Sequence, residues 1–339
     1  MSLLLKLPHR PHRPQAIFTT ITARLFSFTV QNPNPNPKLF LDEPTSAYYD
    51  NLINNAARLH EFETVRQLLN KRVRDCCFNT GNTFKFLTNT ESSLSILPAL
   101  SQTLAQLDPG FTRRNAYDSL IARLCKLNRI KESLQLIDTM WHEKFGLTAC
   151  SFYPILCKLT RGKKMEDAWH VINLMRATSV PPDLTAFNYL LTAYCFSGNL
   201  MEASKVMQKL EEEGLGADSR TYDALVLGAC RVGKVEGALV VLRRMEDDGV
   251  PALYSTYAHL INALLRLGYY AQAVQFVKIC GGRDLKLDIE SFGTLASKMI
   301  RMGRNDEAKL VVEEMDKRGL VMGEKLKDYY ELNVKKVNI

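Results

Sequence analysis

The fold of this chain is decided by the stretch Leu184-Thr185-Ala186-Phe187-Asn188-Tyr189-Leu190-Leu191 and by Gly198-Asn199-Leu200-Met201-Glu202-Ala203, which follows it. The aromatic residue of the first segment recurs every 35 residues, at Tyr117, Phe152, Phe187, Tyr222, Tyr257 and Phe292. A small residue follows the same period, at Ser133, Ala168, Ala203, Ala238, Ala273 and Ala308. So does an aliphatic residue or Met, at Ile137, Ile172, Met207, Leu242, Val277 and Val312. Three rows with one period indicate tandem repeats that stack on one another.

One repeat reads as two helices. We start each repeat three residues before its aromatic, so that the aromatic is position 4. In the third repeat, helix A is then predicted over Leu184 to Ser197 and helix B over Leu200 to Glu213. Gly198 lies between them, where a left-handed residue can end a helix. Positions 4, 7, 8 and 11 fall on one side of helix A and are apolar, which predicts the core face.

This register divides most of the chain. Six repeats are predicted, at 114–148, 149–183, 184–218, 219–253, 254–288 and 289–323. Two divergent repeats are expected in 46–113, because Tyr49-Asp50-Asn51-Leu52-Ile53 repeats the opening motif and Phe84 supplies a later aromatic. The polar segment 324–339 is predicted to be a capping helix, which a stack of repeats needs at its end.

The first residues read as a targeting segment. No Asp or Glu occurs before Asp42, whereas Arg, Lys, Ser and Thr are frequent. This composition is typical of an organellar transit peptide. The stretch Ala23-Arg24-Leu25-Phe26-Ser27 resembles plant mitochondrial cleavage sites, so we predict a mitochondrial transit peptide over 1–26, with a chloroplast address or an untargeted basic tail as alternatives. Residues 27–45, rich in Asn and Pro, are predicted to form an extended linker.

The charge of the chain favours an acidic partner. The formal net charge is +8, and four of the basic residues lie in 1–26, so 8 − 4 leaves about +4 for the remainder. Position 13 lies on the side of helix A opposite the core and is cationic in five repeats, at Lys126, Arg161, Arg231, Arg266 and Arg301. Such a row suits the phosphates of a polyanion. Because position 13 is also in the last turn of helix A, capping of the helix is the alternative role.

Several classes of function find no support in the residues. There is no apolar run long enough to suggest a membrane span. The eight cysteines contain no CxxC pair and, with the six histidines, no zinc spacing. No nucleotide-binding glycine motif or deaminase pattern is present. We therefore predict a protein that is not an enzyme and has no cofactor or metal.

A 35-residue helix pair with an aromatic at position 4, Ala at 20, Met near 27 and Pro-Asp at its end resembles the pentatricopeptide repeat. Met140, Met175, Met245 and Met315 match the late Met of that family. The resemblance is to the P-type, plant organellar branch, which has no C-terminal catalytic extension. It implies a right-handed all-α solenoid that binds single-stranded RNA, with about one base per repeat read by two or three side chains.

In that family, position 5 and the last residue of the repeat discriminate between bases. The corresponding pairs here are Asp118/Thr148, Tyr153/Asp183, Asn188/Asp218, Asp223/Leu253, Ala258/Asp288 and Gly293/Gly323. The resemblance therefore makes Asn188, Asp218, Asp118, Asp223, Asp183 and Asp288 candidates for base contact. Only Asn188/Asp218 is a standard combination, similar to those that select uridine. The chain thus looks like the family scaffold, but most of its residue pairs at position 5 and the last position, the code positions, are not standard base-reading combinations.

Three functions follow from this interpretation. The first is a mitochondrial RNA-binding factor in processing, splicing, stability or translation. The second is a structural component of the mitochondrial ribosome or another ribonucleoprotein assembly. Such a component would not need side chains that discriminate between bases. The third is a scaffold for protein interactions, which leaves the cation row unexplained.

Overall fold

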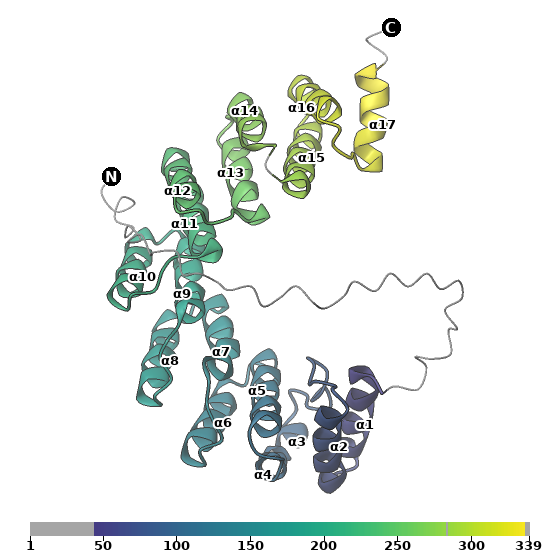
Figure 1. The fold of residues 1–339 in the computed structure, drawn as a ribbon, viewed down its shortest axis with the longest axis vertical. Helices are drawn as coiled ribbons and strands as arrows, with labels where there is room; N and C mark the ends of the chain where they lie inside the picture. The colour runs from purple at the N-terminus through teal and green to yellow at the C-terminus, as the bar shows by residue number, and fades with distance from the viewer. Residues whose placement is uncertain (1–43, 283, 336–339) are drawn as a thin grey trace, which may run out of the picture. The chain divides into compact units, whose positions relative to one another are not determined.

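The regular structure of the described chain is entirely α-helical (Figure 1). The computed structural model describes residues 44–282 and 284–335. The predicted all-α fold is confirmed over this range. The predicted transit peptide (1–26) and all but the last two residues of the predicted linker (27–45) lie outside the described residues.

The described chain divides into two compact units, and the boundary along the sequence falls between Ala186 and Phe187. The helices before this boundary are α1 (Ser46–Arg58), α2 (Phe62–Arg74), α3 (Glu91–Leu94), α4 (Leu97–Ala105), α5 (Phe111–Lys126), α6 (Ile130–His142), α7 (Ala149–Arg161) and α8 (Met165–Ala177). The boundary falls within α9 (Leu184–Ser197). The helices that follow are α10 (Leu200–Glu212), α11 (Ser219–Arg231), α12 (Val235–Asp247), α13 (Tyr254–Arg266), α14 (Tyr270–Cys280), α15 (Leu285–Arg301), α16 (Asn305–Lys317) and α17 (Glu324–Asn333).

Within each unit the helices pack as repeated pairs. In the second unit α11 packs on α12, α13 on α14, and α15 on α16. The first helices of neighbouring repeats also contact one another, α11 with α13 and α13 with α15, while α14 contacts α16. In the first unit α5 packs on α6, α7 on α8, and α5 on α7. Each unit therefore has a layer of A helices beside a layer of B helices.

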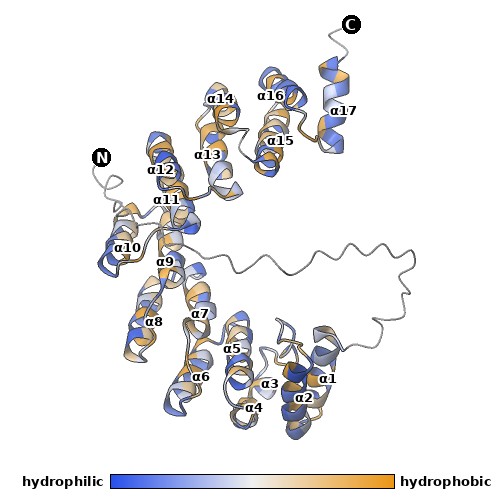
Figure 2. Cartoon of the chain, in the orientation of Figure 1, coloured by the Kyte–Doolittle hydropathy of each residue, from blue (hydrophilic) through white to orange (hydrophobic). Residues whose placement is uncertain are grey.

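The periodic rows of the sequence form the core of these pairs. Every member of the aromatic row is buried, with at most 5% of its surface exposed. The Ser and Ala row is buried to the same degree, which lets helix B approach its partner closely. Hydrophobic residues occur along all the helix pairs and alternate with hydrophilic ones (Figure 2). Burial of these faces is what holds neighbouring repeats together.

The turn between helix A and helix B has one conformation throughout. Gly198 has φ 77°, and glycines occupy the same position in the next three repeats. In the second repeat the glycine stands one place early, at Gly162, and Lys163 takes the left-handed conformation instead, with φ 57°. The turn geometry is therefore set by the packing of the helices, even where it forces a non-glycine residue into a strained conformation.

Two segments differ from a regular helix pair. Residues 81–86 form turns rather than a helix A, although Phe84 is buried as its position in the repeat predicts. The Thr83 hydroxyl accepts from the Thr80 amide, and the Thr80 hydroxyl accepts from the Asn82 amide, so side chains take up the amides that a helix would use. Helix α15 begins at Leu285, four residues before the predicted repeat boundary, because Asp284 caps it by accepting from the Leu287 amide.

Candidate nucleic-acid interface

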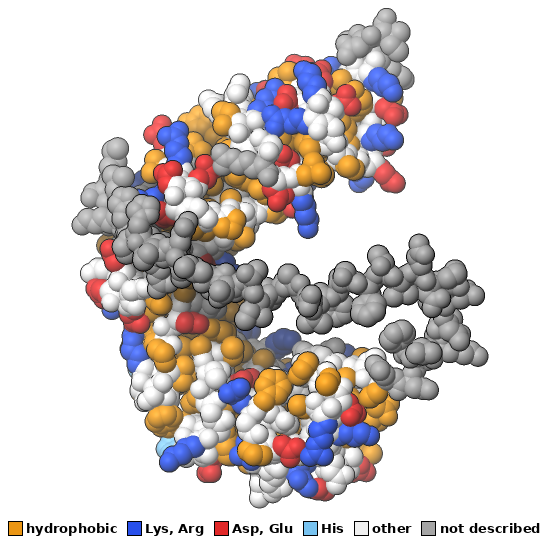
Figure 3. All heavy atoms as spheres, viewed as in Figure 1, with side chains coloured by type: hydrophobic (Ala, Val, Ile, Leu, Met, Phe, Trp, Pro, Cys, Tyr) orange, Lys and Arg blue, Asp and Glu red, His pale blue; other side chains and the backbone are white. Residues whose placement is uncertain are grey.

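The five predicted phosphate-binding cations occupy equivalent places in the structure. Each is the last residue of its helix A, in α5, α7, α11, α13 and α15, and each is exposed. Within residues 44–282 and 284–335, none of the five forms an ion pair. Figure 3 shows basic and acidic side chains interspersed on the face it presents. The five cations are set apart by their repeated position and by the lack of an ion pair within the described residues.

Two of the cations also cap helices, as the alternative interpretation expects. Arg266 Nη2 donates to the Cys230 carbonyl in the last turn of α11, which joins neighbouring repeats. Arg301 Nε donates to the Ser297 carbonyl at 3.3 Å in its own helix. A carbonyl oxygen carries no formal charge, so these bonds orient the guanidinium groups without neutralising them. Capping and phosphate binding are thus compatible at the same residues.

A stacked pair occupies the break in the cation row. Phe196 stands at position 13 of the third repeat and is 55% exposed. The Arg231 guanidinium carbon lies 4.0 Å from the centroid of its ring. An exposed aromatic ring beside a guanidinium plane is a surface on which a nucleobase can stack.

Two of the candidate aspartates, Asp183 and Asp218, are the last residues of their repeats and cap the N-terminus of the next helix A. Asp183 accepts from the Ala186 amide at 2.9 Å, and Asp218 accepts from the Thr221 amide at 2.8 Å. Asp183 also accepts from the Tyr153 hydroxyl. An N-cap of this kind stabilises a helix by about 1 kcal/mol. These two carboxylates therefore have a structural role whether or not they contact a base.

The candidates at position 5 bond to the following repeat. Asn188 accepts from the Thr221 hydroxyl at 2.9 Å, and its amide donates to Asp218 Oδ1 at 3.1 Å. Asp118 accepts from the Ser151 hydroxyl at 2.6 Å. In both pairs the hydroxyl lies 33 residues after its acceptor, at position 3 of the next repeat. These hydroxyls are absent from the rows predicted above, although a Ser or Thr 33 residues after an Asp or Asn is a sequence signal for them.

Asp223 has more partners than Asp118. The Oδ1 of Asp223 accepts from the hydroxyls of Ser255 and Thr256, both at 2.8 Å, and its Oδ2 lies 3.7 Å from His259 Nε2. Burial alone would raise the pKa of Asp223, but the bonds from His259, Thr256 and Ser255 together hold the pKa below its usual value. At Asp118, which has a single hydroxyl partner, burial instead raises the pKa of the carboxyl.

Asp288 is placed differently from the prediction. It was expected at the end of a repeat, beside the next helix A. Because α15 starts early, Asp288 lies inside the first turn of that helix, is only 7% exposed, and accepts from the Gly282 amide at 2.6 Å. Its carboxylate thus closes the loop before α15.

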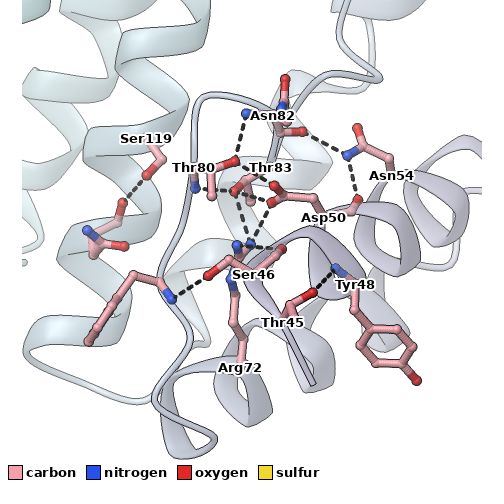
Figure 4. A network of polar contacts seen from close by, with 12 residues as sticks. Thr45, Ser46, Tyr48, Asp50, Asn54, Arg72, Thr80, Asn82, Thr83 and Ser119 are labelled. Carbon is pink, nitrogen blue, oxygen red and sulfur yellow. Dashed lines mark hydrogen bonds and ion pairs between the residues drawn. The ribbon is translucent and has the colours of Figure 1, made fainter. Parts of the chain in front are cut away.

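In the divergent repeat over 46–80, the residues at position 5 and the last position belong to a buried network built on an ion pair (Figure 4). Asp50 stands at position 5, and its Oδ1 lies 2.8 Å from Nη1 of Arg72, a fully buried residue. Thr80, the last residue of this repeat, donates to Asp50 Oδ2 at 2.5 Å, and Thr83 donates to Oδ1 at 2.8 Å. Both oxygens of the Asp50 carboxylate are occupied by these bonds, so the carboxylate is not presented to a ligand.

The last repeat has the opposite character, because both of its code positions are glycine. Gly293 and Gly323 line an open hollow of ≈ 650 Å³ on the A layer of the second unit. The hollow is also lined by Tyr254 and Arg301. No side chain at either code position can present a hydrogen-bonding group there.

The described residues also bear on two further kinds of site, a metal centre and a membrane span. No group of three or more His, Cys, Asp or Glu side chains in this part of the chain could hold a metal ion. The helices described include none that is both long enough and apolar enough to cross a membrane.

Stacked helix pairs of 35 residues, with an exposed cation at the end of helix A in five of the six regular repeats, define a helical-repeat protein. Comparisons with known proteins identify the repeat. The PPR repeat family matches residues 182–231, and the PPR repeat matches residues 116–145, 220–250 and 290–320. Two Arabidopsis thaliana proteins, both named as mitochondrial pentatricopeptide repeat-containing proteins, are similar over most of the chain. One is 49% identical and covers 98% of this chain and 95% of its own length; the other is 55% identical and covers 85% and 82%. The chain belongs to the pentatricopeptide repeat family.

A solved structure supports the fold. The crystal structure of the pentatricopeptide repeat protein PPR10 from maize superposes with a TM-score of 0.54 at 18% sequence identity. The match covers 86% of this chain and 44% of the maize protein. At this identity the likeness concerns the arrangement of helices alone.

Proposed function

We propose that this chain is a mitochondrial RNA-binding protein that holds single-stranded RNA along its layers of A helices and acts in organellar RNA metabolism. The observation that carries the proposal is the row of exposed cations, each at the end of an A helix and none in an ion pair within the described residues. A strand that crosses the A helices of successive repeats would meet such a cation at each repeat except the third, where Phe196 takes its place. Membership in the family and the acid-poor N-terminal sequence support the mitochondrial location, since both long relatives are named as mitochondrial.

The contacts favour binding of RNA with weak selection of bases. At position 5, Asp118, Asn188 and Asp223 each accept a hydrogen bond from a hydroxyl of the next repeat. Reading a base through these atoms would compete with bonds that join the repeats. Affinity in this proposal comes from phosphates and stacking, which do not depend on sequence. Asn188 with Asp218 is the combination best suited to a base preference, and the preference expected is for uridine.

The proposal is tested by measuring affinity for a single-stranded RNA over a range of salt concentrations. The double variant Arg231→Ala/Arg266→Ala should bind more weakly, and its log–log salt slope should be smaller by about 1.4, because each phosphate contact on a single strand contributes about 0.7. A wild-type affinity no greater than that of a charge-matched control protein would end the proposal.

A structural role in the mitochondrial ribosome or a similar assembly is the second candidate. The engaged position 5 side chains and the Gly293/Gly323 pair favour it, because a protein that only holds structured RNA has no need of a base code. Crosslinking in isolated mitochondria followed by sequencing separates the two candidates. Ribosomal RNA among the crosslinked products, with cosedimentation of the protein, would favour the assembly. One short footprint on a transcript would favour a transcript-specific factor.

A further inference from the structure

A second hollow lies between α13 and α15, beside the glycine-lined one. It measures ≈ 300 Å³ and is lined by Asn262, Leu265, Arg266, Lys298, Arg301 and Met302. Three of these six residues are cations, and no carboxylate is among the described residues that line it. Two of the cations belong to the predicted row. The third, Lys298, stands at position 10 of the last repeat, where the three preceding repeats have Ala193, Gly228 and Ala263.

Uncharged oxygen atoms nearby hold the three cations in place without neutralising them. Lys298 Nζ donates to Asn262 Oδ1, across the boundary between two repeats. Arg266 and Arg301 donate to backbone carbonyls, as described above. All three acceptors are uncharged oxygens, so the hollow keeps its positive charge.

The proximity of these cations is unfavourable in the absence of an anion. Lys298 precedes Arg301 by three residues on the same helix, a spacing that brings side chains together. Burial lowers the pKa of Lys298, and the charge of Arg301 lowers it further. A bound anion would remove this repulsion.

We propose that Arg266, Lys298 and Arg301 form one anion site that binds a single phosphodiester of an RNA strand, shared between two neighbouring repeats. The inference rests on the proposed function and adds to it a residue outside the periodic row. It also makes the contacts to the strand uneven, with the strongest phosphate contact at the last two repeats. Exposed Met302 and the aliphatic Leu265 give the hollow an apolar wall, which suits the sugar that adjoins a phosphate.

The test uses the full chain and a fluorescent oligouridylate of about eight nucleotides, one for each repeat. Lys298→Gln is compared with Lys317→Gln, which removes the same charge from an exposed site on helix B α16. Lys298→Gln should weaken binding several-fold and reduce the salt slope by about 0.7, whereas Lys317→Gln should leave both close to the wild-type values. Arg301→Gln and the double variant Lys298→Gln/Arg301→Gln complete a cycle. If both side chains bind one phosphate, the double variant should lose less affinity than the product of the two single losses.

The outcomes distinguish the inference from the proposed function. Wild-type binding with identical affinities for Lys298→Gln and Lys317→Gln would overturn the site and leave the RNA-binding proposal standing. Losses that multiply would also overturn it, because they indicate two separate contacts. Competition by a polyglutamate peptide at concentrations as low as those of the oligouridylate would assign the hollow to an acidic peptide instead. No wild-type affinity above a charge-matched control would remove both proposals.

Discussion

The Thr221 hydroxyl donates to Asn188 Oδ1 at 2.9 Å, across the boundary between two repeats. The two residues are 33 positions apart, and the same separation joins Asp50 to Thr83, Asp118 to Ser151 and Asp223 to Thr256. A position that the family resemblance assigns to base reading therefore has a second task, which is to join one helix A to the next. A buried bond of this kind is worth about 1 kcal/mol, so these residues have a structural reason to be polar.

The boundary between the last two repeats lacks this bond, and restoring it should stabilise the protein. Ser291 Oγ is buried without a hydrogen-bond partner, and the residue 33 positions before it is Ala258. Ala258→Asn would supply an acceptor where Asn188 supplies one for Thr221. We expect the free energy of unfolding to rise by about 1 kcal/mol, measured by chemical denaturation.

The matched control places the same substitution in a Ser291→Ala background. There the new amide has no hydroxyl to accept from, and the gain should disappear. An equal gain in both backgrounds would show that the stabilisation comes from somewhere other than this bond.

A substitution of Arg72 should instead lower the free energy of unfolding. Arg72 is fully buried at position 27, where other repeats have Met140, Met175, Met245 and Met315, and it pairs with Asp50 at 2.8 Å. Arg72→Met should cost about 3–5 kcal/mol, because it leaves a buried carboxylate without its cation. The double variant Asp50→Asn/Arg72→Met should recover most of the loss in the same denaturation assay. Wild-type stability for Arg72→Met alone would contradict the account of this network.

The small residues at position 20 are predicted to set the distance between the two helices of a repeat. Ala203 is 2% exposed on α10, so Ala203→Phe must separate the helices or distort them. We expect thermal unfolding at a clearly lower temperature, from a cost of about 1–3 kcal/mol or more. Met201→Phe, at a 64% exposed position on the same helix, is the control and should change little. Equal effects of the two variants would show that close helix packing is not the reason for the small residue.

The regular part of the fold could be predicted because each row of the repeat has one physical role. Helix A of the third repeat was expected over Leu184 to Ser197 and lies there. The exposure of the position 13 cations also followed from their angle on helix A. Periodicity could not predict the start of α15, which is set by the local cap Asp284, or the turns at 81–86, which arise from local Thr bonds.

The sequence predicted where the position 13 cations lie, but not what the side chains at position 5 contact. A residue type at position 5 does not reveal what its side chain contacts, and Asp118 and Asp223 have different hydroxyl partners and opposite pKa shifts. Position 10 is cationic in only three of the six repeats, at Arg123, Lys158 and Lys298, so it does not form a continuous row. The packing of α13 on α15 places Lys298 beside two members of the row, in the lining of one hollow.

The central claim is that RNA lies along the A helices, at their cationic ends. The most direct measurement is photocrosslinking of the full chain to an oligonucleotide containing 4-thiouridine, with the crosslinked residues located by mass spectrometry. The account predicts crosslinks at exposed Phe196 and beside Arg266 and Arg301, at the ends of α9, α13 and α15. Crosslinks confined to the B helices α12, α14 and α16, or none above a charge-matched control protein, would contradict it.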